Sequence, residues 1–236
     1  NQRNERMGWT GDISVFAKTG TYLTDSEAFL RRYMLAMRDT QDADGRFADI
    51  APIGGGFGGI LWGSAGLTVA WESYQQYGDK DMLDEHYSST VKYLDYIAKT
   101  TPNWAGFLGD WLAPEGLLMG PNEKNFLLWE AYYIYDLDLA SKMAEVLGKT
   151  EDSKKYRDLY NKAKDEFNKK YLNENKQTIE AGTGNLIDNQ GSYAIPLALG
   201  IIKEENKVQF AKNLANAVSR KNKDFMGIER PEYSLM

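Results

Sequence analysis

The sequence predicts an all-α domain in which consecutive helices pack as antiparallel hairpins. Apolar residues recur at helical spacing along most of the 236 residues, and strand-like alternation appears only briefly around residues 177–179. The connections between helical segments are short, which favours antiparallel packing of neighbours. No internal repeat is evident, which argues against a regular solenoid. We therefore expect about eight helices in one domain.

The first two expected helices cover residues 25–41 and 60–77. Thr24 and Glu27 give the Thr-x-x-Glu pattern, in which two side chains satisfy free backbone N–H groups at a helix start. The apolar stripe of the first helix consists of Phe29, Tyr33, Ala36 and Met37. The second helix is apolar nearly all round, as expected of a buried helix, and ends at Gly78.

The later helices carry clear start residues. Asp79 is placed to cap the third helix, which ends near Pro102. Asn122 precedes a long helix over residues 123–147, which is closed by Gly148. Three more helices are expected, one starting at Thr150 and two covering residues 192–199 and 203–219.

Four connections are richer in Gly, Trp and Asp than an ordinary surface turn requires. They cover residues 1–12, 42–59, 103–116 and 173–191. A helical scaffold that presents polar and aromatic loops at one end commonly builds a ligand cleft. We expect the functional site at these loops.

Composition and charge exclude several classes of function. The net charge is −6 and no basic run exists, so nucleic acid is not an expected partner and a neutral ligand fits better. The lack of cysteine excludes disulfides, thiol catalysis and cysteine-ligated metals, and His86 alone cannot supply a multi-histidine metal site. No stretch approaches the ~18 consecutive apolar residues of a membrane span, so no membrane partner is expected.

The ends of the chain predict a piece of a larger protein. Asn1 is not a start methionine, and the last residues show no helix stop. Oligomeric state stays open at this stage. Lack of cysteine does not settle the compartment, and we favour a protein exported by a bacterium over a cytoplasmic one.

The first connection contains the segment QRNERMGWTGD, residues 2–12, with two carboxylates seven residues apart, two arginines, a tryptophan and two glycines. A carboxyl beside Trp9 could be desolvated and so stay protonated, as a general acid must. Arg3 or Arg6 would instead keep a neighbouring carboxylate ionised. From residue types alone, a surface loop with Glu–Arg ion pairs is the better account, and the density of glycine, tryptophan and acid only narrows the difference.

A second candidate site is the segment FLGDWLAP, residues 107–114. The carboxylate of Asp110 could accept hydroxyl hydrogens of a sugar while the indole of Trp111 stacks on its C–H faces. Asp110 could equally cap a turn, and Trp111 could belong to the core. Both interpretations stand.

The glycine run at residues 54–59 lacks the Gly-Lys-Ser/Thr ending of a phosphate loop and follows no evident strand, so we do not expect nucleotide binding there. A mobile loop over a cleft is the better account. Trp62 follows this loop and could line the cleft, although the core is its default place. His86 is expected to be a packed or surface residue. Three helical acids, expected to be solvated or ion-paired rather than catalytic, are Glu72, Glu130 and Asp136.

The segment QRNERMGWTGD resembles the signature of family 78 glycoside hydrolases, the bacterial α-L-rhamnosidases. This motif is long and specific. Further resemblances run in the same order along nearly the whole chain: FADIAP at residues 47–52, WG at 62–63, GDWL at 109–112 and SYA at 192–194. Two departures are Asn4, where the family usually has aspartate, and Ser64, where it often has aspartate; the second leaves one sugar contact open.

The resemblance implies an (α/α)6 toroid of six helical hairpins around a central cleft, truncated here at both ends. It also implies inverting hydrolysis of terminal α-L-rhamnose, with no cofactor. Glu5 falls on the family's general acid and Asp12 on an acid that contacts the substrate. The other substrate-binding positions that we expect are Arg3, Trp9, Trp62, Asp110 and Trp111. The base, a glutamate late in the family's sequence, is expected beyond Met236.

Two alternatives to a rhamnosidase stay open. The first is another (α/α)6 enzyme, a hydrolase or lyase of uronides, for which only Arg3, Arg6 and Arg46 qualify as carboxylate-binding residues of the cleft loops. The second is a helical carbohydrate-binding module without catalytic activity.

Overall fold

The computed structural model describes residues 4–57, 59–109 and 120–220, and these residues form nine helices and no strand. Three isolated β-bridges are the remaining regular pairs, and two of them lie around the strand-like residues 177–179. The helices are α1 (Thr10–Leu23), α2 (Glu27–Asp39), α3 (Ile60–Gly63), α4 (Ala65–Tyr77), α5 (Lys80–Lys99), α6 (Glu123–Val146), α7 (Thr150–Lys170), α8 (Gln190–Ala198) and α9 (Glu204–Ser219).

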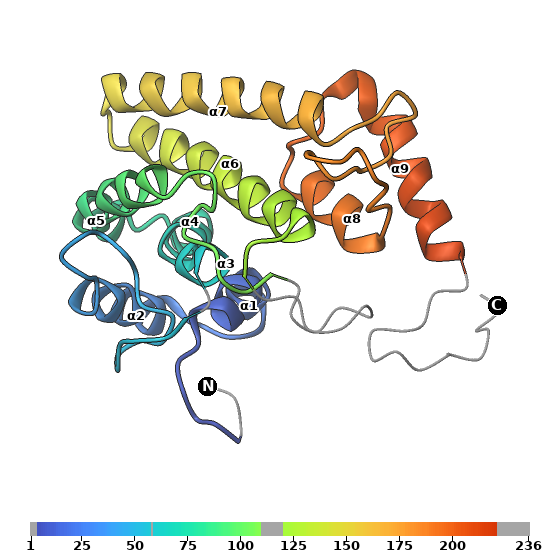
Figure 1. The fold of residues 1–236 in the computed structure, drawn as a ribbon. Helices are drawn as coiled ribbons and strands as arrows, with labels where there is room; N and C mark the ends of the chain where they lie inside the picture. Colours follow the sequence, from blue (N-terminus) through green and yellow to red (C-terminus); the bar gives the residue numbers. More distant parts are fainter. Residues whose placement is uncertain (1–3, 58, 110–119, 221–236) are drawn as a thin grey trace.

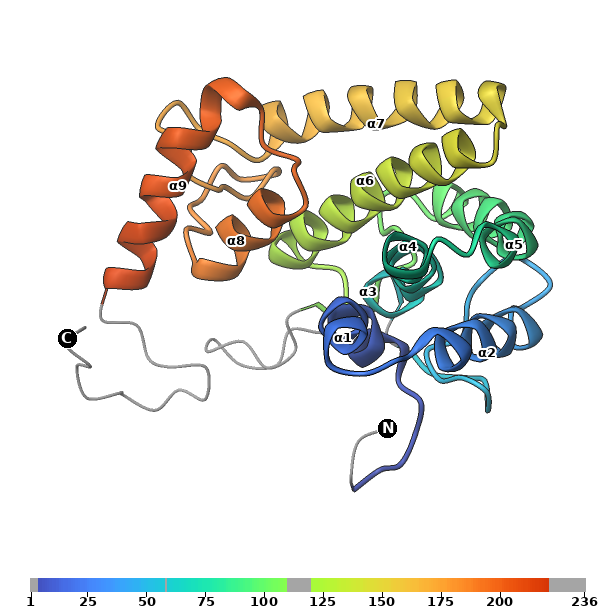
Figure 2. The same cartoon turned by 180° about the vertical axis from the view of Figure 1, so that it is seen from behind.

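The helices alternate between an inner and an outer layer. The inner helices α1, α4, α6 and α8 contact one another in that order. The outer helices α2, α5, α7 and α9 each follow an inner helix in the chain and surround the inner row from outside (Figures 1 and 2). The described residues therefore form four inner–outer hairpins, with the short α3 as an extra turn before α4. This arrangement confirms the predicted all-α fold of helical hairpins.

Helix α6 joins two apolar cores. The larger core fills the space between α1, α2, α4, α5 and one face of α6, and Trp129 and Leu137 contribute to it from α6. The smaller core lies between the opposite face of α6 and α7–α9, and includes Leu127 and Phe210. Because both faces are covered, α6 is apolar on nearly all sides. None of the described helices combines the length and hydropathy of a membrane span.

The predicted start residues of α5 and α6 and the predicted end of α4 are confirmed. The side chain of Asp79 accepts a hydrogen bond from the Met82 backbone at 2.9 Å, and that of Asn122 accepts one from Asn125 at 2.9 Å. Gly78 ends α4 in the left-handed region, at φ 71°, where a glycine has no Cβ to clash.

Three predictions about the first helices are wrong. The capping box of Thr24 and Glu27 does not form; α2 begins at Glu27 after Ser26, and Thr24 bonds instead to Gly20 and Ser26. The expected continuous helix over 60–77 is divided at Ser64 into α3 and α4.

The third error concerns α1, which the sequence did not reveal. Its residues show no single apolar stripe, because Val15, Phe16, Tyr22 and Leu23 are large apolar side chains on exposed faces. Without that periodicity no element was expected at residues 13–24, and residues 10–12 were expected in a connection. Asp12 therefore lies on the first turn of a helix and not in a loop.

His86 is a packing residue, as expected. Its ring is fully buried, stacks on Phe47 with the ring centroids 5.6 Å apart, and its Nε2 lies 2.7 Å from the carbonyl oxygen of Gly66. Burial, and then the positive charge of Arg38, lower the pKa of His86 to about 4, against the effect of the Gly66 bond. The ring therefore stays neutral well below pH 6.

Candidate active site

The four loops predicted to carry the site lie at one end of the inner helix row. Loop 1 (residues 4–9), loop 2 (residues 40–57 and 59), loop 3 (residues 100–109 and 120–122) and loop 4 (residues 171–189) are named here by their described residues. Each leads into an inner helix or, for loop 2, into α3 before α4. Loops 1 and 2 pair at Trp9 and Ile50, and loop 2 touches loop 3 where Gly59 meets Ala105. Loop 4 reaches the start of α6, because the Gly182 N–H donates to Glu123 Oε2 at 3.3 Å.

Loop 1 holds the carboxyl of Glu5 against Trp9. The indole N–H of Trp9 donates a hydrogen bond to Oε2 of Glu5, four residues earlier. Between them, Arg6 takes a left-handed backbone conformation at φ 57°, which turns the chain so that the two side chains meet. The Glu5 side chain is exposed, so Trp9 contacts the carboxyl without desolvating it.

The start of α1 lies directly beside Glu5 and Trp9. Asp12 is exposed on the first turn of α1. Burial and then the negative charge of Asp12 raise the pKa of Tyr33, whose hydroxyl donates to the carbonyl oxygen of Gly8 at 3.2 Å. An exposed carboxylate on a helix's first turn is well placed to accept hydroxyl hydrogens from a ligand above that helix end.

Trp62 belongs to α3 and is half-buried, with its indole against α1. A Cβ added to Gly11 would come within 2.9 Å of Trp62 Nε1, so the indole packs on the first turn of α1 only because residue 11 is glycine. Trp62 thus lies at the loop end of the helices, partly exposed and packed on α1.

Loop 2 is fastened to α1 by its buried segment around Asp49. The Thr10 N–H donates to the Asp49 carbonyl oxygen at 2.9 Å, and the Ala51 N–H donates to the Gly8 carbonyl oxygen at 3.0 Å. The carboxylate of Asp49 is fully buried and pairs with Arg46 at 3.3 Å. Arg46 is therefore engaged within the loop.

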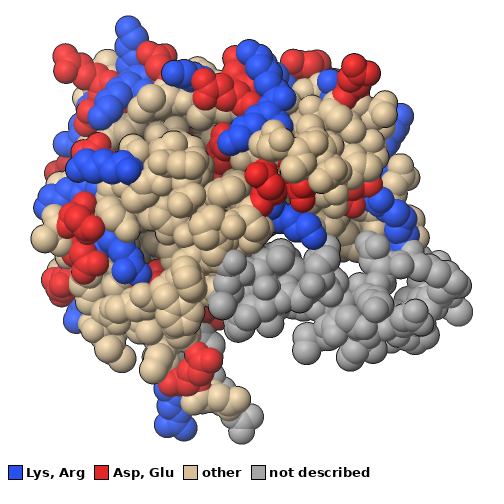
Figure 3. Space-filling model, viewed as in Figure 1, with Lys and Arg blue, Asp and Glu red and all other residues tan. Residues whose placement is uncertain are grey.

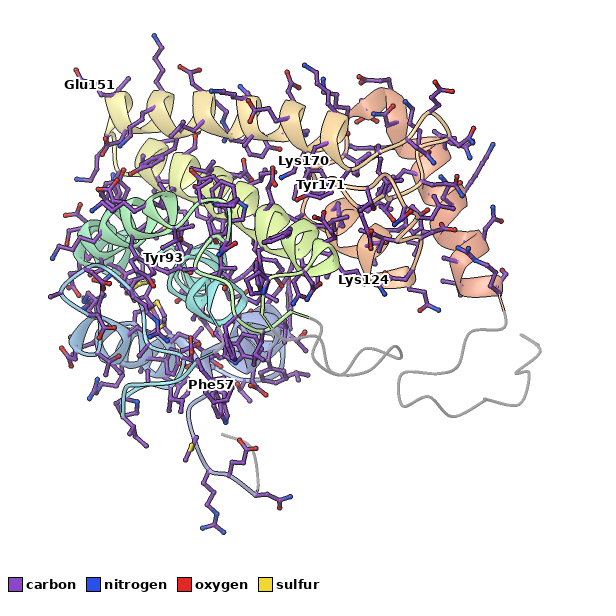
Figure 4. All side chains as sticks on the ribbon, in the orientation of Figure 1. Phe57, Tyr93, Lys124, Glu151, Lys170 and Tyr171 are labelled. Atoms are coloured by element: carbon purple, nitrogen blue, oxygen red, sulfur yellow. The ribbon has the colours of Figure 1, made fainter. Side chains whose placement is uncertain are left out.

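Aromatic side chains extend from this fastening toward loop 3. The rings of Trp9 and Phe57 meet edge to face with centroids 6.4 Å apart, and those of Phe57 and Phe107 do so at 6.0 Å. Phe57 stands at the edge of the helical body next to the N-terminal segment (Figure 4). Neither phenylalanine was a site candidate from the sequence. The signal that could have indicated Phe57 is its position as the single aromatic residue of a glycine run, because a glycine-rich loop exposes a side chain more easily than it buries one.

Several sequence candidates lie outside the described residues. They are Arg3, Asp110 and Trp111. Within the described ranges, no group of three acidic or histidine side chains is arranged to hold a metal ion.

Two of the helical acids, Glu130 and Asp136, are buried and hydrogen-bonded to other parts of the fold. Glu130 is buried on α6 and accepts hydrogen bonds from Lys170 at 2.6 Å and from the Tyr171 hydroxyl at 3.0 Å, and both partners stand at the end of α7 (Figure 4). Asp136 is fully buried and accepts from the Ser64 hydroxyl at 2.7 Å. Burial raises the pKa of Asp136 well above its usual range, although the Ser64 bond opposes this. Ser64 thus faces α6 and not the loop end.

The fold and this site together define a class of protein: a helical-hairpin domain with an acid and aromatic residues at the N-terminal ends of its inner helices. Comparison with known proteins is consistent with that class. The chain matches the bacterial alpha-L-rhamnosidase 6 hairpin glycosidase domain over residues 1–226. It belongs to this family.

The relatives are much longer than the chain. An α-L-rhamnosidase from Streptomyces avermitilis is 34% identical over 226 residues, which make up 93% of this chain and 20% of the relative. The crystal structure of a Streptomyces avermitilis α-L-rhamnosidase complexed with L-rhamnose matches with a TM-score of 0.77 and 33% identity, over 92% of this chain and 20% of that one. The α-L-rhamnosidase from Dictyoglumus thermophilum matches with a TM-score of 0.79 and 33% identity, over 91% and 24% of the two chains. The chain thus spans about a fifth of the curated relative's length.

Proposed function

We propose that this chain carries the general acid of an inverting glycosidase that releases terminal α-L-rhamnose, and that this acid is Glu5. The observation that carries the proposal is the hydrogen bond between Glu5 and Trp9 at the end of the inner helices where loops 1 and 2 pair. Membership of the rhamnosidase family supports the substrate class. The rhamnose complex of a 33% identical structure supports it as well.

In the proposed reaction, Glu5 gives its proton to the oxygen that joins the sugar to its leaving group. The bond between that oxygen and the anomeric carbon breaks while a water molecule attacks the carbon from the opposite face, and a second carboxylate takes the proton of the water. The Trp9 N–H holds Oε2 of Glu5, which leaves Oε1 to face the glycosidic oxygen. Because Glu5 is exposed in the protein alone, the bound substrate would supply the apolar cover that a protonated carboxyl needs.

The sugar itself would lie between Glu5 and the start of α1. Asp12, exposed on the first turn, would accept hydroxyl hydrogens, and the accessible part of Trp62 would face the C–H groups of the ring. The family resemblance adds three residues in the same role: Arg3, Asp110 and Trp111.

The general base is proposed to lie outside residues 1–236, on another part of the same six-hairpin ring. The family is named for six hairpins, and four are present among the described residues. The exposed surface of α1 and α2 supports this proposal. It carries large apolar side chains, and two of them, Phe16 and Phe29, line a hollow of about 260 Å³, a surface typical of contact with another element. The exposed residues are Val15, Phe16, Tyr22, Leu23 and Phe29.

Substitution of the acid tests the proposal. In the complete protein, Glu5→Gln should lower kcat on phenyl α-L-rhamnoside, whose leaving group is not activated, by about 10²- to 10⁴-fold, the usual contribution of general acid catalysis. Glu27→Gln changes another exposed glutamate, on α2, and should leave kcat unchanged. Unchanged turnover in Glu5→Gln would contradict the assignment. Proton NMR of the first product should show β-L-rhamnose, and an α product would contradict the inverting mechanism.

The uronide alternative is weakened by Arg46. A uronate site needs a cation that is available to the substrate carboxylate, but Arg46 already pairs with buried Asp49 and donates to the Gly56 carbonyl oxygen at 2.9 Å. Parallel assays of an aryl α-L-rhamnoside and an unsaturated uronide with the complete protein separate the two substrate classes. A binding module without activity would turn over neither.

A further inference from the structure

Two exposed phenylalanines continue the aromatic row away from the proposed acid. Phe57 in loop 2 is 57% exposed and Phe107 in loop 3 is 43% exposed, yet their rings meet edge to face. On the other side, Phe57 meets Trp9, which holds Glu5. The order of contacts is therefore Glu5, Trp9, Phe57, Phe107. Glu5 and Trp9 both belong to loop 1, whereas Phe57 belongs to loop 2 and Phe107 to loop 3.

The position of Phe57 is fixed by a network in the chain around it. Arg46 donates to the carbonyl oxygen of Gly56 at 2.9 Å and pairs with the buried carboxylate of Asp49. Gly56 has a φ of 106° and packs so closely on Asp49 that a Cβ there would clash. The Asp49 N–H also donates to the Gly55 carbonyl oxygen at 2.8 Å. A surface ring on a loop held in this way has a defined place.

Phe107 is held just as firmly from the side of α6. The carbonyl oxygen of Phe107 accepts a hydrogen bond from the Gly120 N–H at 2.7 Å. The next carbonyl, that of Leu108, accepts one from the buried indole of Trp129 at 2.8 Å. The backbone is thus anchored in the core while the ring stays outside.

The chemistry of the two rings limits what they can bind. Phenylalanine offers no hydrogen-bond donor or acceptor, so the pair cannot satisfy the hydroxyls of a second sugar. Its rings match the faces and edges of another aromatic group. Charged side chains are interspersed over much of the molecule, but the surface beside the N-terminal segment is mostly uncharged (Figure 3).

We propose that Phe57 and Phe107 form a subsite for the leaving group, and that this subsite selects rhamnosides with an aromatic aglycone. The inference rests on the proposed function of Glu5. An acid that protonates the glycosidic oxygen lies beside the leaving group, and the row of rings begins at that acid. Phe57 and Phe107 are therefore residues that determine specificity, whereas Glu5 acts on the reacting atoms.

Binding of two unreactive analogues to the complete protein tests this subsite. Phenyl and methyl 1-thio-α-L-rhamnosides share the sugar and differ only in the aglycone, and calorimetry gives the ratio of their Kd values. We expect the phenyl analogue to bind more tightly to the unsubstituted protein. Phe57→Ala and Phe107→Ala should each reduce this preference by about 2- to 12-fold, the range of one aromatic contact.

Three further variants make the result specific. Phe57→Tyr keeps the ring and should keep the preference, whereas Phe57→Leu keeps only apolar surface and should lose part of it. Leu159→Ala removes an exposed apolar side chain on α7 and should not change the ratio. Thermal unfolding of each variant shows that it is folded.

The subsite is refuted if the phenyl analogue has no advantage, or if its advantage survives in both alanine variants. If neither analogue binds to the unsubstituted protein, the rhamnosidase proposal itself fails. The two failures are therefore distinguishable.

Discussion

Loops 2 and 4 both position an inner helix, but they are held in different ways. Each precedes an inner helix at the loop end of the fold. Loop 2 is fastened by an ion pair inside the loop, between Arg46 and the buried carboxylate of Asp49, and exposes Phe57 and Ile53. Loop 4 is fastened to the helices that follow it, by the Thr178 hydroxyl bonded to that of Ser192 at 2.7 Å and by the ion pair of Asp188 with Arg220.

This difference divides the loop end of the fold into two chemically distinct sides. The Arg46–Asp49 ion pair engages the two charges next to Gly56, and the loop 2 side chain that meets Trp9 is the ring of Phe57. In loop 4, polar side chains remain at the surface, among them Glu180, Thr183 and Asn185. The site end therefore has an apolar side near α1 and α3 and a polar side near α8. The predictions below, from the largest effect to the smallest, test whether different interactions stabilise the loop 2 side and the loop 4 side.

The largest effect concerns acid stability on the loop 2 side, where Phe47 stacks on His86. The pKa of His86 is about 4 in the folded protein, below its ordinary value, so the unfolded chain binds the extra proton first. Stability is therefore complete above pH ~6.5 and falls as the pH drops toward 4, by about 3 kcal/mol over that window. Urea unfolding at a series of pH values measures this loss. His86→Gln has no proton to gain and should remove most of the slope; an unchanged slope would assign it to other groups.

The next effect concerns the ion pair of loop 2. Arg46→Met removes one partner of the buried Asp49 carboxylate and the bond to Gly56, which should cost about 2 kcal/mol of unfolding free energy. Because Phe57 follows Gly56, the aryl preference should fall as well. Arg32→Met, at an exposed position on α2, is the control and should change neither quantity. A stable Arg46→Met variant would mean that the ion pair does not fasten the loop.

The smallest effect concerns loop 4. Burial would raise the pKa of Asp188, but the bonds from Arg220 and the Tyr193 hydroxyl outweigh it and lower that pKa below its usual value. Such a carboxylate stabilises the fold above pH ~4 and loses its contribution as the pH falls through the lowered pKa.

Asp188→Asn should therefore cost about 1 kcal/mol at pH 7, and this cost should disappear as the pH falls through the lowered pKa of Asp188. Asp158→Asn on α7 is an exposed control. Acid loss in Asp188→Asn equal to that of the unsubstituted protein would show that loop 4 is not held by this charge. The loop 2 and loop 4 sides should thus weaken in separate pH windows.

The sequence predicted those parts of the fold that follow from local physics. Asp79 and Asn122 cap helices because a carboxylate or amide oxygen directly satisfies a free backbone N–H. The four loops were recognisable because glycine, tryptophan and aspartate are rare together in helices. Helix α1 was missed because its apolar residues lie on several faces, several of them exposed.

Tertiary contacts of the site were not predictable in the same way. The neighbours Trp9 and Phe57 are 48 positions apart, and only the folded loops bring their rings together. Arg46 looked like a cation available to a ligand, but its partner is set by the turn of loop 2. The Thr24–Glu27 pattern failed because the chain enters α2 two residues later than the motif requires. Glu5 itself was marked by a family motif and not by its spacing.

The most direct test of the account is how the effect of Glu5→Gln depends on the leaving group. A dinitrophenolate departs without a proton, whereas methanol needs one. The account predicts that Glu5→Gln lowers kcat/KM for methyl α-L-rhamnoside by about 10³-fold or more and for the dinitrophenyl compound by less than about tenfold. Equal losses on both substrates would contradict the assignment of Glu5 as the proton donor.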